Sequence, residues 1–133
     1  MTRENVERAH QVIDAVEHRD LATLISLTDP EVEWRSAFVV GGGGGVYRGH
    51  DGMREYVNDM NDAWDIVRLD VDHEIGVRDV VVFVGRIHYR GKASGVEAES
   101  ESGYMLKFRD GRVLRFRPFQ DPEEALEAVG RRE

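Results

Sequence analysis

Apolar residues recur along this chain at two spacings, and the change between them divides it in two. Up to residue 64 the spacing is mainly that of amphipathic helices, with helices expected over residues 3–18 and 51–64 and a shorter one between Asp20 and Pro30. Beyond residue 65 the pattern is that of long, connected strands. Helices first and strands afterwards predict an α+β fold with an antiparallel sheet. They argue against the alternating strands and helices of a nucleotide-binding α/β fold.

Two of the expected helices carry a clear apolar face. On the first, the residues at helical spacing are Val6, Ala9, Ile13 and Val16. On the third, the apolar stripe consists of Met53, Tyr56, Val57, Met60 and Trp64. Both faces are expected to pack against the sheet.

The strands are expected in one early and one late group. Residues 31–35 alternate between polar and apolar, which predicts a strand with Val32 and Trp34 pointing inwards. The later strands are expected at 66–78, 80–89, 96–108 and 112–119, with a hairpin turn at Asp110-Gly111 and a closing helix from Asp121 to Gly130.

Length and charge limit the classes of function. The 133 residues are enough for one domain, expected to span 1–133, with a core of its own. The net charge is -8 with both signs mixed, so binding to nucleic acid or to an anionic membrane is not expected. No apolar stretch is long enough to span a bilayer. The chain has no cysteine, which excludes disulfides and cysteine metal sites and favours a cytoplasmic location.

The segment Gly41 to Gly45 is a run of five glycines. Glycine loses the most backbone entropy on ordering, so such a run is typical of a mobile loop. It is either a lid at the mouth of a cavity or a surface loop that tolerates insertions. A phosphate-binding loop is not indicated, because no Lys-Ser or Lys-Thr follows the run.

Several short stretches occur in an order that covers almost the whole chain. They are Asp29-Pro30-Glu31-Val32-Glu33-Trp34, Tyr47-Arg48-Gly49-His50-Asp51-Gly52, Ala63-Trp64, Gly91, Ser94-Gly95, Phe108-Arg109-Asp110-Gly111-Arg112-Val113, and the tail from Asp121-Pro122 to Gly130. Together they resemble the SnoaL-like branch of the nuclear-transport-factor-like superfamily, which also holds the ketosteroid isomerases.

The resemblance implies a fold, but not one activity. The implied fold is a cone: a curved antiparallel sheet packed against three N-terminal helices, with a short C-terminal helix and a pocket between helices and sheet. Such proteins are commonly homodimers, and pairing through the outer face of the sheet is expected here. The family includes isomerases, polyketide cyclases, hydrolases and binding proteins.

The catalytic residues of known members have no clear counterparts here. Ketosteroid isomerases use a tyrosine on the first helix, where this chain has Val12, Ile13 and Val16. Their aspartate base follows the first strand, where Ser36 stands, and their second acid lies on a late strand, near Ser100 and Ser102 here. Steroid isomerase activity is therefore not expected. The late-strand aspartate of the cyclases has no counterpart either, since Asp110 lies in a turn and Asp121 caps a helix.

His88 is the catalytic candidate that the residues themselves favour. It follows an apolar strand, and imidazole exchanges protons near neutral pH. Arg86 lies on the same face of that strand and offers paired donors to a carboxylate or enolate. The alternatives are a strand-end histidine at the surface or at a dimer interface, and an arginine paired with a neighbouring acid.

Aromatic residues and one further arginine are the candidates for ligand contact. The expected ligand-binding residues are Trp34, Tyr56, Met60, Trp64, Arg86, Tyr104, Arg117 and Phe119. Each aromatic residue among them is expected to face the interior, either against a ligand or as ordinary core. Arg115 and Arg117 share a face that lines the pocket or forms salt bridges at an interface. Glu97, Glu99 and Glu101 are expected to meet these arginines across strands.

Two functions follow as hypotheses. In the first, the protein is a cofactor-independent isomerase, cyclase or hydrolase acting on a small apolar molecule, with His88 as the acid–base group. In the second, it is a noncatalytic ligand-binding or dimeric assembly module. No metal site is expected, because the five histidines do not pair at a ligand spacing. A titratable group facing a cavity would favour the first hypothesis.

Overall fold

The computed structural model describes residues 2–36, 45–119 and 122–130. Gly41 to Gly44 of the glycine run lie outside these ranges, so both interpretations of that run stay predictions. The N-terminal helix cap expected at Asp121 likewise lies outside the described residues.

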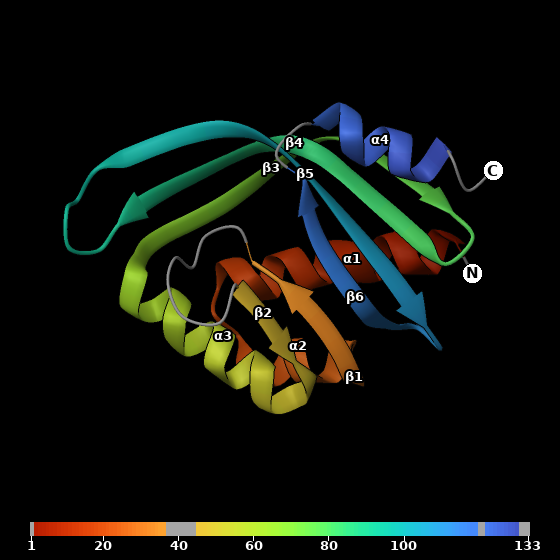
Figure 1. Ribbon diagram of the computed structural model, residues 1–133, viewed down its shortest axis with the longest axis horizontal. Coiled ribbons are helices and arrows are strands. Elements are labelled where there is room, and N and C mark those ends of the chain that lie inside the picture. Colours follow the sequence, from red (N-terminus) through yellow and green to blue (C-terminus); the bar gives the residue numbers. More distant parts are fainter. Residues whose placement is uncertain (1, 37–44, 120–121, 131–133) are drawn as a thin grey trace.

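The order of the elements confirms the predicted α+β class. The helices are α1 (Thr2–Glu17), α2 (Leu21–Leu27), α3 (Gly49–Ala63) and α4 (Pro122–Gly130). The strands are β1 (Thr28–Arg35), β2 (Val46–Arg48), β3 (Trp64–Val77), β4 (Val80–Gly91), β5 (Glu97–Arg109) and β6 (Arg112–Phe119). Within the described residues they form one six-stranded sheet in the order β2-β1-β6-β5-β4-β3 (Figure 1).

Local sequence signals explain where several helices and strands begin or end. The side chain of Asp20 caps α2 by accepting a hydrogen bond from the backbone N–H of Thr23 at 3.2 Å. Asp110 and Gly111 both have positive φ, 53° and 78°, as a tight hairpin turn between β5 and β6 requires. The chain therefore turns at the residues where the sequence predicted a turn.

Two features of the sheet differ from the expectation. β1 pairs with β6 in parallel, with Trp34 opposite Phe116, whereas the other pairings of described strands are antiparallel. The short strand β2 was not predicted. Neither feature has a local signal: β1 and β6 lie far apart in sequence, and three residues are too few for a period to show.

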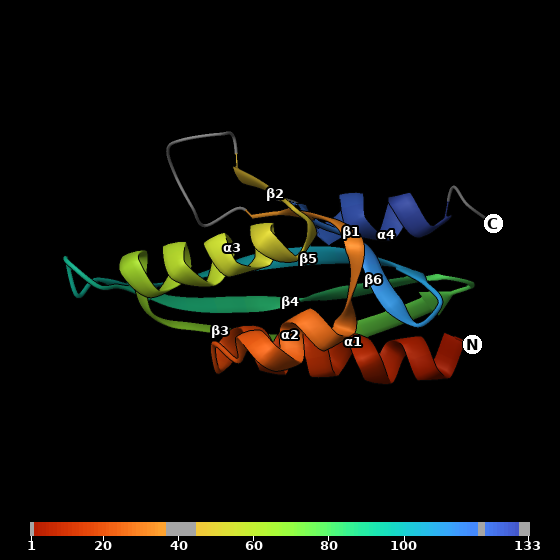
Figure 2. The same ribbon diagram turned by 90° about the horizontal axis from the view of Figure 1, so that it is seen from below.

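Helices cover the two faces of the sheet unequally. α1 and α2 lie along one face and α4 lies across the opposite face (Figure 2). We call the face shared with α1, α2 and α3 the inner face; on β4 it presents Val81, Phe83 and Ile87 to the main core. The outer face presents Val80 and Val82, which pack with Ala125 of α4 and form a second, smaller core.

The part of β4 that α4 covers explains the burial pattern along this strand. From Val80 to Phe83 the strand is buried on both faces, because α4 covers the outer one. Past Val84 the outer face carries Arg86 and His88, while Ile87 remains buried on the inner face. The continuous apolar run at the start of the strand is therefore explained by α4, which buries the outer-face residues as well as the inner ones. No helix of the described residues is long and apolar enough to cross a membrane.

Candidate functional site

A cavity lies between the helices and the inner face of the sheet. Its walls come from α1, α3 and four strands, together with the residue that follows β1. The lining residues are Ile13, Val16, Glu17, Ser36, Tyr56, Val67, Leu69, Ile87, Tyr104 and Phe116. The cavity measures about 30 Å³, which is room for one or two water molecules. Its walls are mostly apolar, with a few polar groups among them.

The helix and strand periods place these lining residues on faces that point towards the same cavity. Ile13, Val16 and Glu17 fall on one face of α1 because they are three and four residues apart. Ile87, Tyr104 and Phe116 occupy inner-face positions on β4, β5 and β6, which are neighbours in the sheet. The cavity is thus formed where the face of α1 meets the centre of the curved sheet.

Tyr56 and Tyr104 are the polar aromatic residues of the cavity. Each is only 3% exposed. Burial, the largest cause in both cases, raises the pKa of Tyr56 well above its usual range and that of Tyr104 to about 12. Both hydroxyls therefore stay protonated at neutral pH and are able to donate a hydrogen bond. The sequence predicted both residues as ligand contacts, and the structure brings them together in the cavity wall.

Glu17 is a cavity residue that the sequence pattern did not single out. Glu17 is among the residues that line the cavity, and its Oε1 accepts a hydrogen bond from the backbone N–H of Leu69 at 2.8 Å. Among the described strands β3 lies at the edge of the sheet, and Glu17 satisfies this N–H in place of a neighbouring strand. A signal was present, because Glu17 lies four residues after Ile13 and so falls on the inward face of the helix.

The cavity adjoins a groove on the surface. The groove runs between α1 and β3 and is lined by residues that include His10, Asp14 and Asp70. Ile13, Glu17 and Leu69 line both the cavity and the groove. These three side chains therefore form the boundary between the cavity and the groove.

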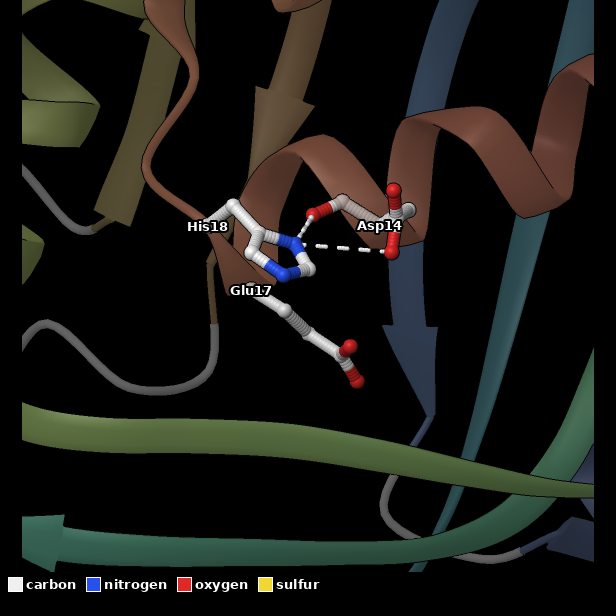
Figure 3. A group of neighbouring side chains, drawn as sticks. All are labelled: Asp14, Glu17 and His18. Atoms are coloured by element: carbon white, nitrogen blue, oxygen red, sulfur yellow. Dashed lines mark hydrogen bonds and ion pairs between the residues drawn. The ribbon is translucent and has the colours of Figure 1, made fainter.

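Glu17 also belongs to a group with the composition of a metal site. The ligand atoms of Asp14, Glu17 and His18 all lie within 4.8 Å of one another at the exposed end of α1 (Figure 3). His18 Nδ1 lies 2.8 Å from the backbone oxygen of Asp14 and 3.4 Å from its carboxylate, while Glu17 bonds to Leu69. All three residues thus have partners within the protein that account for their positions.

His88 and Arg86 lie on the outer face, on the opposite side of the sheet from the cavity. His88 Nε2 is 2.8 Å from Asp70 Oδ2 and its Nδ1 is 2.9 Å from Glu99 Oε2. The imidazole therefore bridges carboxylates on the two neighbouring strands, with its side chain 27% exposed. Arg86 donates to Glu99 at 2.7 Å, and this hydrogen bond raises the pKa of Arg86.

Strand alternation explains this placement. Ile87 points to the inner face, so Arg86 and His88 on either side of it must point outwards. The prediction that they share a face holds, but that face does not border the cavity. A catalytic role for His88 stays a prediction, and any such role would be exerted at the outer face.

Four other predicted ligand contacts do not line the cavity. Trp34 and Met60 are fully buried in the main core. Trp64 packs against Tyr89, with ring centroids 5.3 Å apart. Phe119 is an ordinary core residue, which is one of the two alternatives expected, and it packs in the smaller core under α4.

The charged residues of the late strands also pair differently from the expectation. Arg117 is exposed and its guanidinium lies 5.1 Å from the ring of Phe119. Glu97 and Glu101 stand opposite Arg90 and Arg86 of β4, rather than opposite the arginines of β6. The reason is the length of β5, because its pairing with β6 extends only from Gly103 to Arg109.

Comparison with known proteins identifies relatives of this arrangement. The model of the SnoaL-like domain family matches residues 9–116, which include the cavity-lining residues. None of the curated proteins matches the sequence.

Solved structures share the fold along nearly the whole chain. TerC co-crystallized with polyporic acid is 25% identical, with a TM-score of 0.77 over 96% of this chain and 98% of that one. An NTF2-like protein of unknown function from Burkholderia pseudomallei is 22% identical, with a TM-score of 0.76 over 93% and 95%. A putative SnoaL-like polyketide cyclase from Shewanella putrefaciens is 15% identical, with a TM-score of 0.75 over 100% and 99%.

Proposed function

This chain belongs to the SnoaL-like family, and we propose that it binds a small, largely apolar organic molecule in the cavity between α1 and the sheet. The observation that carries the proposal is the cavity itself, which has apolar walls and counts Tyr56, Tyr104 and Glu17 among its lining residues. A site with mainly apolar walls and a few placed polar groups is typical of small-molecule pockets. The SnoaL-like polyketide cyclase and TerC, with their similar folds, are consistent with such a ligand.

Ligand entry requires side chains at the boundary to move. The cavity of about 30 Å³ is smaller than any organic ligand of interest. Ile13 and Leu69 are only partly buried and face the groove, so a change of their rotamers enlarges the cavity without disturbing the core. The ligand therefore enters from the groove, past Glu17.

We further propose that Glu17 is the acid–base group of a cofactor-independent isomerase, cyclase or hydrolase reaction. Among the described residues that line the cavity, it is the one carboxylate, and a carboxylate can accept a proton from a bound substrate. Its Oε1 is held by Leu69, which fixes the orientation of the group. The specific reaction is not assigned.

A noncatalytic ligand-binding module is the second candidate. It is favoured by the bond that already occupies Glu17 Oε1, which gives this carboxylate a structural role at the edge of β3. The two candidates share the binding site and differ only in whether Glu17 transfers a proton. The single domain over residues 1–133 and the cytoplasmic location stay predictions.

We also propose that two copies pair through the outer face of the sheet. Arg86 and Arg90 on β4 lie beside Glu97, Glu99 and Glu101 on β5, so acids and bases alternate over this surface. Such a surface is complementary to itself after a two-fold rotation. Light scattering after gel filtration tests this: a dimer that becomes monomeric in Arg86→Glu supports the pairing, and a monomeric wild type contradicts it.

The binding proposal is tested with α-methylstyrene, a small apolar probe, and with two variants of β3. Leu69→Trp places extra bulk at the cavity boundary, whereas Ile75→Trp places the same bulk at an exposed position on the same strand. We expect the probe to bind the wild type and Ile75→Trp equally and Leu69→Trp at least about tenfold more weakly. Equal binding to both variants would show that the probe binds elsewhere.

A further inference from the structure

Two buried hydrogen-bond donors lack a partner among the described residues. They are Nε1 of Trp34 and Nε of Arg19. Buried polar groups in folded proteins are almost always paired, so each unpaired group calls for a physical explanation. Both of these are donors only, and a donor left unpaired in the protein is satisfied when a ligand brings an acceptor.

Trp34 stands directly behind the cavity wall. Its side chain is 0% exposed, and its ring stacks on Phe116 with centroids 3.9 Å apart and an angle of 5° between the planes. The Trp34 ring also lies 5.2 Å from that of Tyr56. Phe116 and Tyr56 both line the cavity, so the Trp34 ring packs directly against two residues of the cavity wall.

Arg19 approaches from the turn between α1 and α2. It adopts a left-handed backbone conformation with φ 55°, which directs the chain into α2. Its Nη1 donates to Asn61 Oδ1 at 3.0 Å and its Nη2 donates to the carbonyl oxygen of Trp64 at 3.3 Å. Two of the three guanidinium nitrogens are thereby held by α3 and by the start of β3, and Nε remains.

Tyr56 connects the two unpaired donors. Burial is the largest cause that raises the pKa of the Tyr56 hydroxyl, and the indole N–H of Trp34 and the charge of Arg19 act in the opposite direction. The indole N–H nevertheless makes no hydrogen bond of normal geometry to that hydroxyl. The end of the cavity at Tyr56 is therefore rich in donors, while the carboxylate of Glu17 comes from α1 at the boundary with the groove.

We propose that this end of the cavity is an oxygen-acceptor subsite and that the ligand carries a carbonyl, enolate or phenolate oxygen. The oxygen accepts hydrogen bonds from the Tyr56 hydroxyl and from Trp34 Nε1, with the positive charge of Arg19 beside them. The inference rests on the proposed function, because it assigns a ligand class to the same cavity. A ligand group that only donates hydrogen bonds would leave Trp34 Nε1 unpaired.

The test compares two probes of the same shape. Acetophenone has a carbonyl oxygen where α-methylstyrene has a methylene group. Dissociation constants of both are measured for the wild type, for Tyr56→Phe and for Tyr47→Phe. Tyr47→Phe is the matched control, because it removes a hydroxyl from the same aromatic cluster, one that bonds to Asp59 at 2.6 Å and does not line the cavity.

The preference for acetophenone is the dissociation constant of α-methylstyrene divided by that of acetophenone. In this ratio, any change in protein packing that weakens both probes equally cancels out. We expect the ratio to fall about fivefold in Tyr56→Phe and to stay unchanged in Tyr47→Phe. In the wild type, acetophenone should also shift the NMR resonance of the Trp34 indole N–H, while α-methylstyrene should not produce the same hydrogen-bond shift. The indole N–H of Trp64 serves as the internal reference.

The outcomes separate the two proposals. Binding of α-methylstyrene with an unchanged ratio in Tyr56→Phe and no specific shift at Trp34 overturns the subsite and leaves the cavity as a binding site. Binding of neither probe overturns both. A lower ratio together with the Trp34 shift supports the subsite even if Tyr56→Phe loses some stability, because the shift is measured on the wild type.

Discussion

Arg109 holds Asp29 through two hydrogen bonds, from Nη2 to Oδ1 at 2.9 Å and from Nε to Oδ2 at 3.1 Å. Its Nη2 also donates to Glu31 at 2.7 Å. The pair joins the start of β1 to the end of β5 across the intervening strand β6. The segments around Asp29 and Arg109 are two of the stretches by which the sequence resembles its family, and this contact gives them a shared structural reason.

The first prediction concerns the pH dependence of this pair. The hydrogen bonds from Arg109 are the largest cause that holds the pKa of Asp29 below its ordinary value of 3.8. A carboxyl whose pKa is lower in the folded state stabilises the fold above pH 3.8 and loses that contribution as pH falls through the folded value. Asp29→Asn should therefore lower the melting temperature at pH 7 by roughly 5 °C, and this effect should shrink as pH falls below 3.8.

The measurement is thermal unfolding of both proteins from pH 7 to pH 2. Asp62→Asn, at an exposed position on α3, is the control for removing a negative charge. A difference between Asp29→Asn and wild type that stays constant down to pH 2 would contradict the assigned role.

The second prediction concerns Gly85, where β3 and β4 approach closely. A Cβ on Gly85 would lie 1.9 Å from the backbone oxygen of Asp70, next to the irregularity in β3 between Val71 and His73. Because backbone on both strands must shift, we expect Gly85→Ala to lower the free energy of unfolding by about 3 kcal/mol. Gly95→Ala meets open space and costs only its left-handed φ of 67°, about 1 kcal/mol. Urea unfolding of the two variants checks this, and equal losses would disprove the close approach.

The third prediction separates His88 from the cavity. Its imidazole bonds to Asp70 and Glu99 on the outer face, so His88→Gln should change the dissociation constant of α-methylstyrene by less than about twofold. The same variant tests the sequence-based hypothesis directly. If binding is lost while the fold is retained, His88 acts on the cavity after all.

The fourth prediction concerns Glu17 as an acid–base group. If it accepts a proton from carbon beside a bound carbonyl, the protein should catalyse exchange of the methyl hydrogens of acetophenone with deuterium from D₂O. Glu17→Gln keeps an oxygen for the Leu69 N–H and should reduce that exchange by about a hundredfold or more.

The control for Glu17 is Glu7→Gln, at an exposed position on the same helix. Proton NMR follows the loss of the methyl signal. Exchange that is equal in Glu17→Gln and the wild type rules out Glu17 as the base, and no exchange above buffer in the wild type favours the noncatalytic module.

The fold was largely predictable because most of its signals are local. Helical spacing located α1 and α3, Asp20 located the start of α2, and Asp110-Gly111 located the last hairpin. The parallel pairing of β1 with β6 was missed, since it joins distant segments and no local pattern sets its direction.

The candidate site was predictable only in part. Tyr56 and Tyr104 were expected and line the cavity, because inward aromatic residues are evident from strand and helix periods. Phe119 was expected to be either a ligand contact or core, and its place under α4 was not evident because that depends on packing between distant elements. Glu17 was overlooked because a glutamate near a helix end is ordinarily a solvated residue, and its role follows from the unpaired edge of β3.

The most direct measurement of the central claim is a methyl NMR titration of the protein with acetophenone. The cavity-lining methyl groups of Ile13, Val67 and Ile87 should shift with one common dissociation constant, while Val80 and Val82 under α4 should not. Shifts confined to the outer face, or no saturable shift at the cavity residues, would contradict a small-molecule site between α1 and the sheet.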